Sequence, residues 1–563
     1  MGGRRWIAAP VAIVVVATLA ACAPAVPETV VQGTEITAGW TGELTSLNAA
    51  AAPTPGNIDI AQAVRADFGD VVDGEFVPDE GFGTVSIVSE DPFTVRYDLA
   101  EPVWSDGIPL DAADLLLGWA GAAGEFAPDD AVVASDPAAP EVTKVDEFAR
   151  SIEVTYAQPV IDWQQRVTVP VPAHIVGQRG LDIDDPMEAK QAVIRAVQSG
   201  DAGDLASLAK IWNDGFIVDD SSDLSADLLL SSGPFRIEKV GDEGDSVTLV
   251  PNGEFRGPVT PQVARIELTP PGDDPVAAIG DTLDVAQMRP TAENREPIRE
   301  LERQDYTVDT SHDGTVWAVL VNPVGAFTQQ PARTAFFHSI PASALIAGGA
   351  GEWAQSYTGT TSMLSAPGSR AYDIVNEDSG FADSIGSPNG DAGAERELSG
   401  VAAGAPVCVL YDRTSAFAAG VFAAMAQSAG EARWSIQDCG TDDLDAALDA
   451  GQWDAAIVRE AIPQSPAQIL ARWGTSGKAA AIGATDPARD ELVSQLARTA
   501  DVYEGREVLA QIEASIVRMA VAMPLAVNPR LTIVDKDVTG IGPRTGAIAP
   551  LTSSIVQWAV VPK

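Results

Sequence analysis

The sequence predicts a mixed α/β protein built from two or three lobes. Segments that alternate as strands do and segments with helical periodicity are interleaved along the chain, which is typical of a mixed α/β architecture. With 563 residues the chain is too long for one hydrophobic core. Its content of 46% hydrophobic and 20% charged residues is typical of a globular protein rather than a disordered one.

The N-terminus has the pattern of a secretory signal. Two arginines precede an apolar segment at residues 6–19, which is short for a membrane-spanning helix of about 20 residues. Leu19–Cys22 resembles a lipobox, in which the cysteine takes a diacylglycerol, and a further acyl chain such as palmitate makes the anchor stable. We therefore expect removal of residues 1–21, lipidation of Cys22 and a tether at residues 22–34, which hold the protein at the outer face of the cell membrane. The alternative is an ordinary signal peptide followed by a chance cysteine.

The chain is strongly acidic. Its formal net charge is −45, and removal of the two N-terminal arginines leaves about −47. A surface of this charge repels nucleic acid backbones and anionic lipid headgroups. We therefore expect no nucleic-acid partner.

After lipidation of Cys22, two cysteines remain. Cys408 lies in a candidate strand at residues 406–410, and Cys439 ends a candidate strand at residues 433–439, with a helical pattern between the two strands. A strand–helix–strand unit sets its strands side by side in parallel, and an exported protein meets an oxidising compartment. We expect a disulfide between Cys408 and Cys439, and two buried free thiols are the alternative.

Local patterns predict several elements in order. Residues 83–99 alternate on both sides of a turn and predict a hairpin. Asp111 is a good N-cap for the helix that follows it, with Asp114 in an acidic variant of the capping box. Residues 375–400 are rich in Gly, Ser, Asp and Asn and predict a surface excursion rather than a core element. Residues 485–520 have a helical pattern.

The segment at residues 104–115 resembles a signature of the extracytoplasmic solute-binding proteins of family 5, which serve peptide and nickel ABC importers. In that family a hairpin leads into aromatic-His/Ser-Asp-Gly-x-Pro-Leu-x-Ala-x-Asp-Val. The matching residues are Trp104, Asp106, Gly107, Pro109, Leu110, Ala112 and Asp114, with Leu115 in place of valine. Turn and capping chemistry assigns Asp106, Gly107 and Asp114 a structural role.

Four further blocks resemble the family in the family's own order. They are Ser232–Arg236 with Val247–Asn252 and Phe255–Gly257, then Gly280–Ala286, then Val319–Asn322 with Pro331–Arg333 and Ala335–Ile340, and last Met523–Leu525 with Val538–Gly540. The resemblance covers residues 84–541, which is nearly the whole mature chain.

The resemblance implies a bilobal periplasmic-binding-protein-like fold with an extra inserted domain. The expected parts are lobe I at residues 35–80, 191–286 and 521–563, the inserted domain II at residues 81–190, and domain III at residues 287–520. In the family, lobe I and domain III enclose the ligand by hinge closure.

The resemblance also directs attention to ligand-binding residues. Several members carry an aspartate after a strand of domain III that pairs with the α-amino group of a peptide. The matching position here holds Ile462 or Pro463, so this anchor is absent or moved. Glu460 is the nearest carboxylate that could replace it, and Arg459 could bind a carboxylate, although both could equally be solvated charges.

Trp40 and Thr41 end the first predicted strand, at the edge that faces the cleft in the family. Trp40 could stack on a ligand or pack on lobe I.

The function implied is that of a monomeric binding protein without enzymatic activity or cofactor. It would capture peptides or peptide-like solutes and deliver them to an ABC permease and its ATPase. The same fold could instead bind a nickel chelate, haem, an opine or an oligosaccharide. A remote alternative is a cell-wall acyl-enzyme that uses Ser207 and Lys210, which match Ser-x-x-Lys but lack the KTG and SDN partners. The three histidines have no zinc-type spacing, so we expect no metal site.

Overall fold

The computed structural model describes most of the chain. It covers residues 26–561 apart from 73, 128–140, 143–144, 146–148, 220–223, 387–389, 543–544 and 547–549. The predicted signal segment and the predicted lipidation site, Cys22, lie outside the described residues. No helix in the described ranges is long and apolar enough to cross a membrane.

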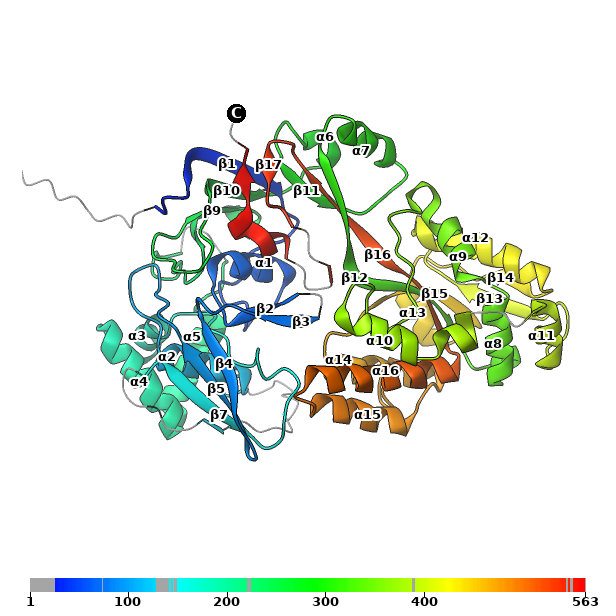
Figure 1. The fold of residues 1–563 in the computed structure, drawn as a ribbon, viewed down its shortest axis with the longest axis horizontal. Helices are drawn as coiled ribbons and strands as arrows, with labels where there is room; N and C mark the ends of the chain where they lie inside the picture. The colour runs from blue at the N-terminus through cyan, green and yellow to red at the C-terminus, as the bar shows by residue number, and fades with distance from the viewer. Residues whose placement is uncertain are drawn as a thin grey trace, which may run out of the picture.

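One ten-stranded mixed sheet connects the two halves of the described chain (Figure 1). Its order is β14 (Ser435–Asp438), β13 (Pro406–Leu410), β15 (Ala455–Ala461), β12 (Thr307–Val321), β16 (Ala522–Val534), β11 (Val285–Met288), β1 (Val31–Gly39), β10 (Val263–Thr269), β9 (Val247–Pro251) and β8 (Phe235–Val240). The long strands β12 and β16 take part in both halves. We call the half with β1 and β8–β11 the first lobe, and the half with β13–β15 the third lobe.

A separate antiparallel sheet forms a second domain beside the first lobe (Figure 1). Its strands, in spatial order, are β4 (Gly83–Glu90), β5 (Phe93–Leu99), β7 (Ser151–Tyr156) and β6 (Glu141–Val142). Its helices are α2 (Ala112–Ala122), α3 (Ala173–Leu181), α4 (Pro186–Ser199) and α5 (Ala202–Asp214). β4 and β5 pair from Gly83–Leu99 to Glu90–Phe93, which confirms the hairpin predicted at residues 83–99.

The remaining α-helices and strands, with the longest 3-10 helix, belong to the two lobes. In the first lobe they are α1 (Pro55–Val64), β2 (Gly69–Val72), β3 (Glu75–Pro78), α6 (Pro275–Ala278), α7 (Arg295–Glu302), β17 (Val538–Thr539), the 3-10 helix at Leu551–Gln557 and β18 (Ala559–Val560). In the third lobe they are α8 (Gln330–His338), α9 (Ala342–Ala350), α10 (Arg370–Asp378), α11 (Ala392–Leu398), α12 (Ala416–Glu431), α13 (Leu444–Ala450), α14 (Pro466–Trp473), α15 (Pro487–Ala497) and α16 (Val502–Met519).

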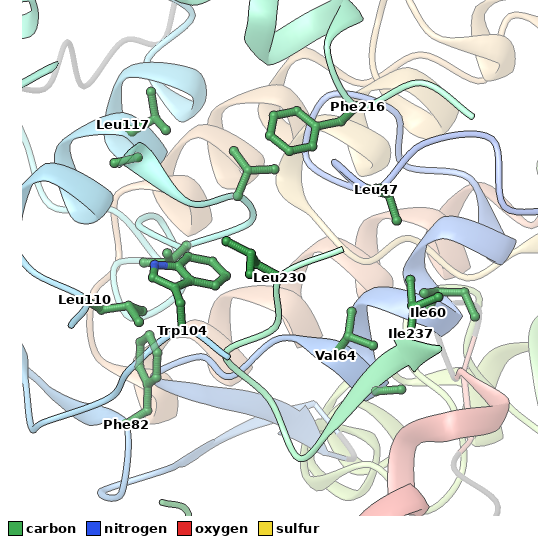
Figure 2. Close-up of a cluster of buried hydrophobic side chains, with 14 of the residues drawn as sticks. Leu47, Ile60, Val64, Phe82, Trp104, Leu110, Leu117, Phe216, Leu230 and Ile237 are labelled. Atoms are coloured by element: carbon green, nitrogen blue, oxygen red, sulfur yellow. The ribbon is translucent and has the colours of Figure 1, made fainter. Parts of the chain in front are cut away.

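The first lobe and the second domain share one hydrophobic core. Figure 2 shows Ile60, Val64 and Ile237 of the first lobe on one side of this cluster, and Trp104 and Leu110 of the second domain on the other. All five side chains are buried, and full burial of a large apolar side chain contributes about 1.5–3 kcal/mol. The two parts are therefore packed as one unit.

A buried ion cluster fixes the start of α2. Asp111 caps the helix by accepting from the Ala113 amide, and the Asp114 side chain completes the predicted capping box. Lys190 of α4 lies 2.8 Å from Asp114 and 3.1 Å from Asp111, and its side chain is fully buried. The expected structural role of Asp114 is confirmed, but the cation that neutralises it was not predicted from the sequence.

The prediction for residues 375–400 is wrong in one respect. The segment contains the end of α10 and all of α11, and the Arg396 side chain is fully buried. Arg396 donates to the carbonyl oxygens of Ala432 and Val401. The glycines and polar residues of this segment are typical of a surface loop, so nothing in its sequence indicated a buried arginine. A buried arginine can be satisfied by backbone carbonyl oxygens elsewhere in the chain, which a local pattern does not reveal.

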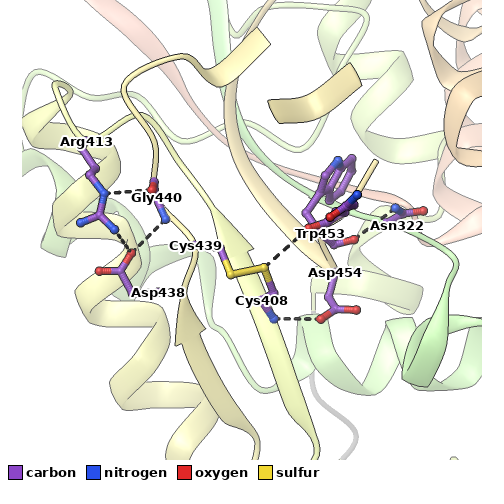
Figure 3. The surroundings of a disulfide bond; sticks show 9 residues. Asn322, Cys408, Arg413, Asp438, Cys439, Gly440, Trp453 and Asp454 are labelled. Atoms are coloured by element: carbon purple, nitrogen blue, oxygen red, sulfur yellow. Dashed lines mark hydrogen bonds and ion pairs between the residues drawn. A yellow bond between two sulfur atoms is a disulfide. The ribbon is translucent and has the colours of Figure 1, made fainter. Parts of the chain in front are cut away.

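The third lobe carries a disulfide between Cys408 and Cys439 (Figure 3). Cys408 lies on β13 and Cys439 directly follows β14, and these strands pair in parallel. The bridge closes a loop with a sequence separation of 31 residues that contains α12. Next to it, the Asp454 side chain accepts from the Cys408 amide at 2.9 Å.

Candidate functional site

The two long strands change register where the lobes meet. Residues 307–312 of β12 pair with 529–534 of β16, and residues 316–320 pair with 522–527. The shift between these ladders leaves a bulge around Gly314, whose φ of +76° suits a glycine. Bulges bend a strand pair, and this one lies where the main sheet passes from the first lobe to the third.

Polar side chains surround the bulge. Asp313 accepts from the Asn528 side-chain amide at 2.7 Å and from the amide and hydroxyl of Thr315. Asn528 in turn accepts from the indole N–H of Trp317 at 2.9 Å. These bonds hold β12 and β16 together where their regular ladder is interrupted.

An aromatic stack lies beside this polar group. The ring centroid of Phe417 is 4.6 Å from that of Trp317 and also 4.6 Å from that of Tyr357. Burial raises the pKa of the Tyr357 phenol to about 12, Asp313 adds to the rise, and Arg459 opposes it. The charges of Asp313 and Arg459 therefore both act at this phenol.

Arg459 is the residue near the bulge whose side chain is available to bind a ligand. It lies on β15 directly opposite Trp317, and its side chain is exposed. Within the described ranges its side chain forms no hydrogen bond or ion pair. A guanidinium in this state can bind a carboxylate through two parallel hydrogen bonds. An unpaired positive charge is also unusual in a chain whose formal net charge is −45.

Glu460 is not available in the same way. It lies on the opposite face of β15, where Arg472 of α14 donates to its two carboxylate oxygens at 3.0 and 3.2 Å. Both side chains are largely buried, and Arg472 also lies over the ring of Trp473. Ile462 is buried, and its amide donates to the Gly314 carbonyl oxygen. In this structure Glu460 therefore does not offer the free carboxylate that the sequence suggested.

On the first-lobe side, Trp40 packs inside the lobe. Its side chain is 2% exposed, and its indole N–H donates to Asp59 at 2.8 Å. Asp59 also accepts from the Leu551 amide, and burial raises its pKa. Of the two alternatives for Trp40, the structure has the packed one, whereas its neighbour Thr41 is exposed.

Arg530 of β16 links the two sides. Burial lowers its pKa, while Asp313 and Asp59 both stabilise its charged form. It donates to the His312 carbonyl oxygen at 2.9 Å. Charged and polar groups thus run from the first lobe past the bulge to the third lobe, and three of them, Asp313, Asn528 and Arg530, were not predicted from the sequence. An Asp-Gly pair inside a long strand pattern, at residues 313–314, was the one available signal.

The acyl-enzyme alternative does not fit the geometry. Ser207 and Lys210 lie on α5, where the Ser207 hydroxyl donates to the Gly203 carbonyl oxygen at 3.0 Å. Lys210 pairs with Asp214 at 3.1 Å, and its side chain is 72% exposed. An activated serine needs its base within hydrogen-bond reach, and here each residue is engaged elsewhere. No group of three potential metal-ligating side chains occurs in the part of the chain that the structure describes.

Comparison with known proteins supports the fold. No family model matches the chain. An uncharacterized lipoprotein of Mycobacterium tuberculosis (strain ATCC 25618 / H37Rv) is 32% identical over 210 residues, which are 36% of this chain and 36% of the relative. A second, from Mycobacterium leprae (strain TN), is 30% identical over 192 residues, which are 33% of this chain and 32% of the relative. The chain thus matches about a third of the length of these curated lipoproteins.

Solved structures match nearly the whole chain. The periplasmic EDTA-binding protein EppA has a TM-score of 0.71 at 16% identity, over 94% of this chain and 97% of its own. The ABC transporter substrate binding protein CtaP from Listeria monocytogenes has a TM-score of 0.70 at 16% identity, over 94% and 100%. The oligopeptide-binding protein AppA from Bacillus subtilis, in complex with a nonapeptide, has a TM-score of 0.59 at 11% identity, over 94% and 99%.

These proteins are binding proteins rather than enzymes. Their likeness confirms that the described chain has the bilobal α/β fold of the solute-binding proteins that its sequence resembles.

Proposed function

We propose that this protein is the lipid-anchored substrate-binding subunit of an ABC importer, and that it captures a peptide or peptide-like solute between its first and third lobes. The solute is held through a carboxylate at Arg459, and lobe closure about the β12–β16 bulge carries it to the permease and its ATPase. The lipid on Cys22 keeps the receptor near the permease, which raises its effective concentration without a tight contact.

The observation that carries this proposal is the state of Arg459. It is exposed, its side chain has no ion pair in the described ranges, and it lies next to Trp317 beside the bulge. The other charged groups there are engaged, since Asp313 accepts from Asn528 and Glu460 from Arg472. A bound carboxylate would give the Arg459 guanidinium the anionic partner that it lacks in this group.

A second candidate is a non-peptide solute rich in carboxylates, such as a nickel chelate or an opine. The engaged state of Glu460 favours it, because a peptide would bring an α-amino group for which this group of residues offers no open carboxylate. The EDTA-binding protein EppA has the same fold and, by its name, takes a polycarboxylate.

Identification of a co-purified solute separates the two candidates. The protein is isolated from its native membrane and denatured, and the released small molecules are analysed by mass spectrometry. Peptides support the first candidate, and carboxylate-rich non-peptides support the second. A released solute without any carboxylate contradicts both.

Calorimetric titration of the released solute then tests Arg459. Since a hydrogen bond to a charged group contributes about 1.5–3 kcal/mol, Arg459→Gln should weaken binding about 10- to 100-fold. Arg195→Gln is the matched control, because Arg195 is an exposed arginine of α4 in the second domain. Equal affinities of the protein and Arg459→Gln would contradict the assignment of the site.

A further inference from the structure

The first lobe reaches the third lobe at a second place, away from the bulge. The β2–β3 hairpin packs on the first-lobe core through Phe76 and projects toward α10 and α16 of the third lobe (Figure 1). A Cβ placed on Gly74, which precedes β3, would lie 3.9 Å from the Cβ of Ser369 at the start of α10. The hairpin is therefore in contact with the other lobe.

Glu75, the first residue of β3, carries the charge in this contact. One carboxylate oxygen pairs with Arg506 of α16, and the other lies 3.3 Å from the guanidinium of Arg370 of α10. The Arg506 side chain is 11% exposed and that of Glu75 is 33% exposed, whereas Arg370 is largely in solvent. One carboxylate of the first lobe is thus held by two arginines of the third lobe.

The second domain adds uncharged contacts to the same side. The indole N–H of Trp163 donates to the Ala500 carbonyl oxygen at 3.3 Å, and the Ile161 amide donates to the Ala497 carbonyl oxygen at 3.2 Å. Ala497 is the last residue of α15, and Ala500 lies between α15 and α16. These bonds involve no charged group, so salt and charge substitutions leave them in place.

We infer that Glu75, Arg370 and Arg506 form a charged latch that holds the third lobe against the first lobe in the absence of solute. A latch of this kind raises the population of the closed form, and solute can enter only from the open form, so the latch lowers the fraction of molecules that can accept solute at any time. The inference goes beyond the proposed function, because it concerns the two lobes alone and requires no solute.

The test measures the distance between the lobes in the full chain without added solute. Cysteines introduced at Val259 of the first lobe and Leu398 of the third lobe, which are 46% and 88% exposed, carry a pair of spin labels. Cys408 and Cys439 are joined to each other and do not take label, and Cys22→Ser removes the remaining native thiol from every protein in the test. Glu75→Gln and Arg506→Gln should each increase the population with a long inter-label distance about fivefold, the size expected for loss of a partly buried ion pair. The double variant should match Glu75→Gln, because Glu75→Gln already removes both pairs of the latch, whereas Arg506→Gln leaves the exposed pair with Arg370.

Arg413→Gln is the control, since it removes an ion pair with Asp438 within the third lobe and should leave the distances unchanged. The unsubstituted protein should also open as salt rises to 1 M, where screening acts within about 3 Å. The salt titration tests the latch in the unsubstituted protein, so it remains informative even if a variant fails to fold. Unchanged distances in Glu75→Gln and Arg506→Gln, or no response to salt, would overturn the latch, and neither result bears on solute binding.

Discussion

The strongest stability prediction concerns Lys190, the buried cation of the second domain. Its ammonium group lies 2.8 Å from Asp114 and 3.1 Å from Asp111, and it donates to the Pro109 carbonyl oxygen at 2.6 Å. Lys190→Met keeps an unbranched side chain that is one atom shorter and removes its charge. Asp114, which is fully buried, is then left without its cation. Loss of one partner from a buried ion pair costs about 3–5 kcal/mol, so the variant should lose that much stability.

Urea unfolding followed by fluorescence measures this loss as a lower midpoint, in the transition of the first lobe and second domain. Lys210→Met is the matched control, because Lys210 forms an exposed ion pair with Asp214 one turn along α5. Exposed pairs of this spacing contribute about 0.3–0.5 kcal/mol, so the control should unfold almost as the unsubstituted protein does. Equal losses in the two variants would refute the argument that burial makes the Lys190 cluster important.

Two further predictions concern the disulfide and a titrating carboxyl. Replacement of Cys408 and Cys439 by serine should destabilise the third lobe by about 3–4 kcal/mol, because a loop with a separation of 31 residues is freed in the unfolded chain. Thermal unfolding of this variant checks it, and a melting temperature equal to that of the oxidised protein would contradict it. Burial raises the pKa of Asp67 to about 7, with Asp70 adding to the rise. The folded protein therefore keeps a proton that the unfolded chain loses between about pH 4 and 7, so stability falls as pH rises through this window. Asp67→Asn should remove that decline, which urea midpoints at pH 5 and pH 8 measure, and an unchanged pH dependence would count against it.

Local chemistry in the sequence predicted local structure. The alternating residues of the 83–99 hairpin and the Asp111 cap both act within a few residues, and both are confirmed. The strand–helix–strand pattern around Cys408 likewise describes a unit that the structure contains. Each of these features depends on neighbours that the sequence places close together.

Contacts between distant segments could not be predicted in the same way. Lys190 is an ordinary helix residue in sequence, and its partner Asp114 lies on a different helix. The engagement of Glu460 by Arg472 depends on how α14 packs on β15, which no local pattern specifies. The bulge in β12 exists because β16, about 200 residues later, pairs with it in two registers. The charged residues near the bulge were therefore open to several interpretations until their partners were known.

The proposed function depends on a carboxylate-bearing solute that binds between the lobes at Arg459. The most direct test is a crystal structure of the protein with its co-purified solute. A solute carboxylate oxygen should lie within about 2.7–2.9 Å of the Arg459 guanidinium, beside Tyr357 and Trp317. A solute bound elsewhere, with Arg459 still in solvent, would contradict it.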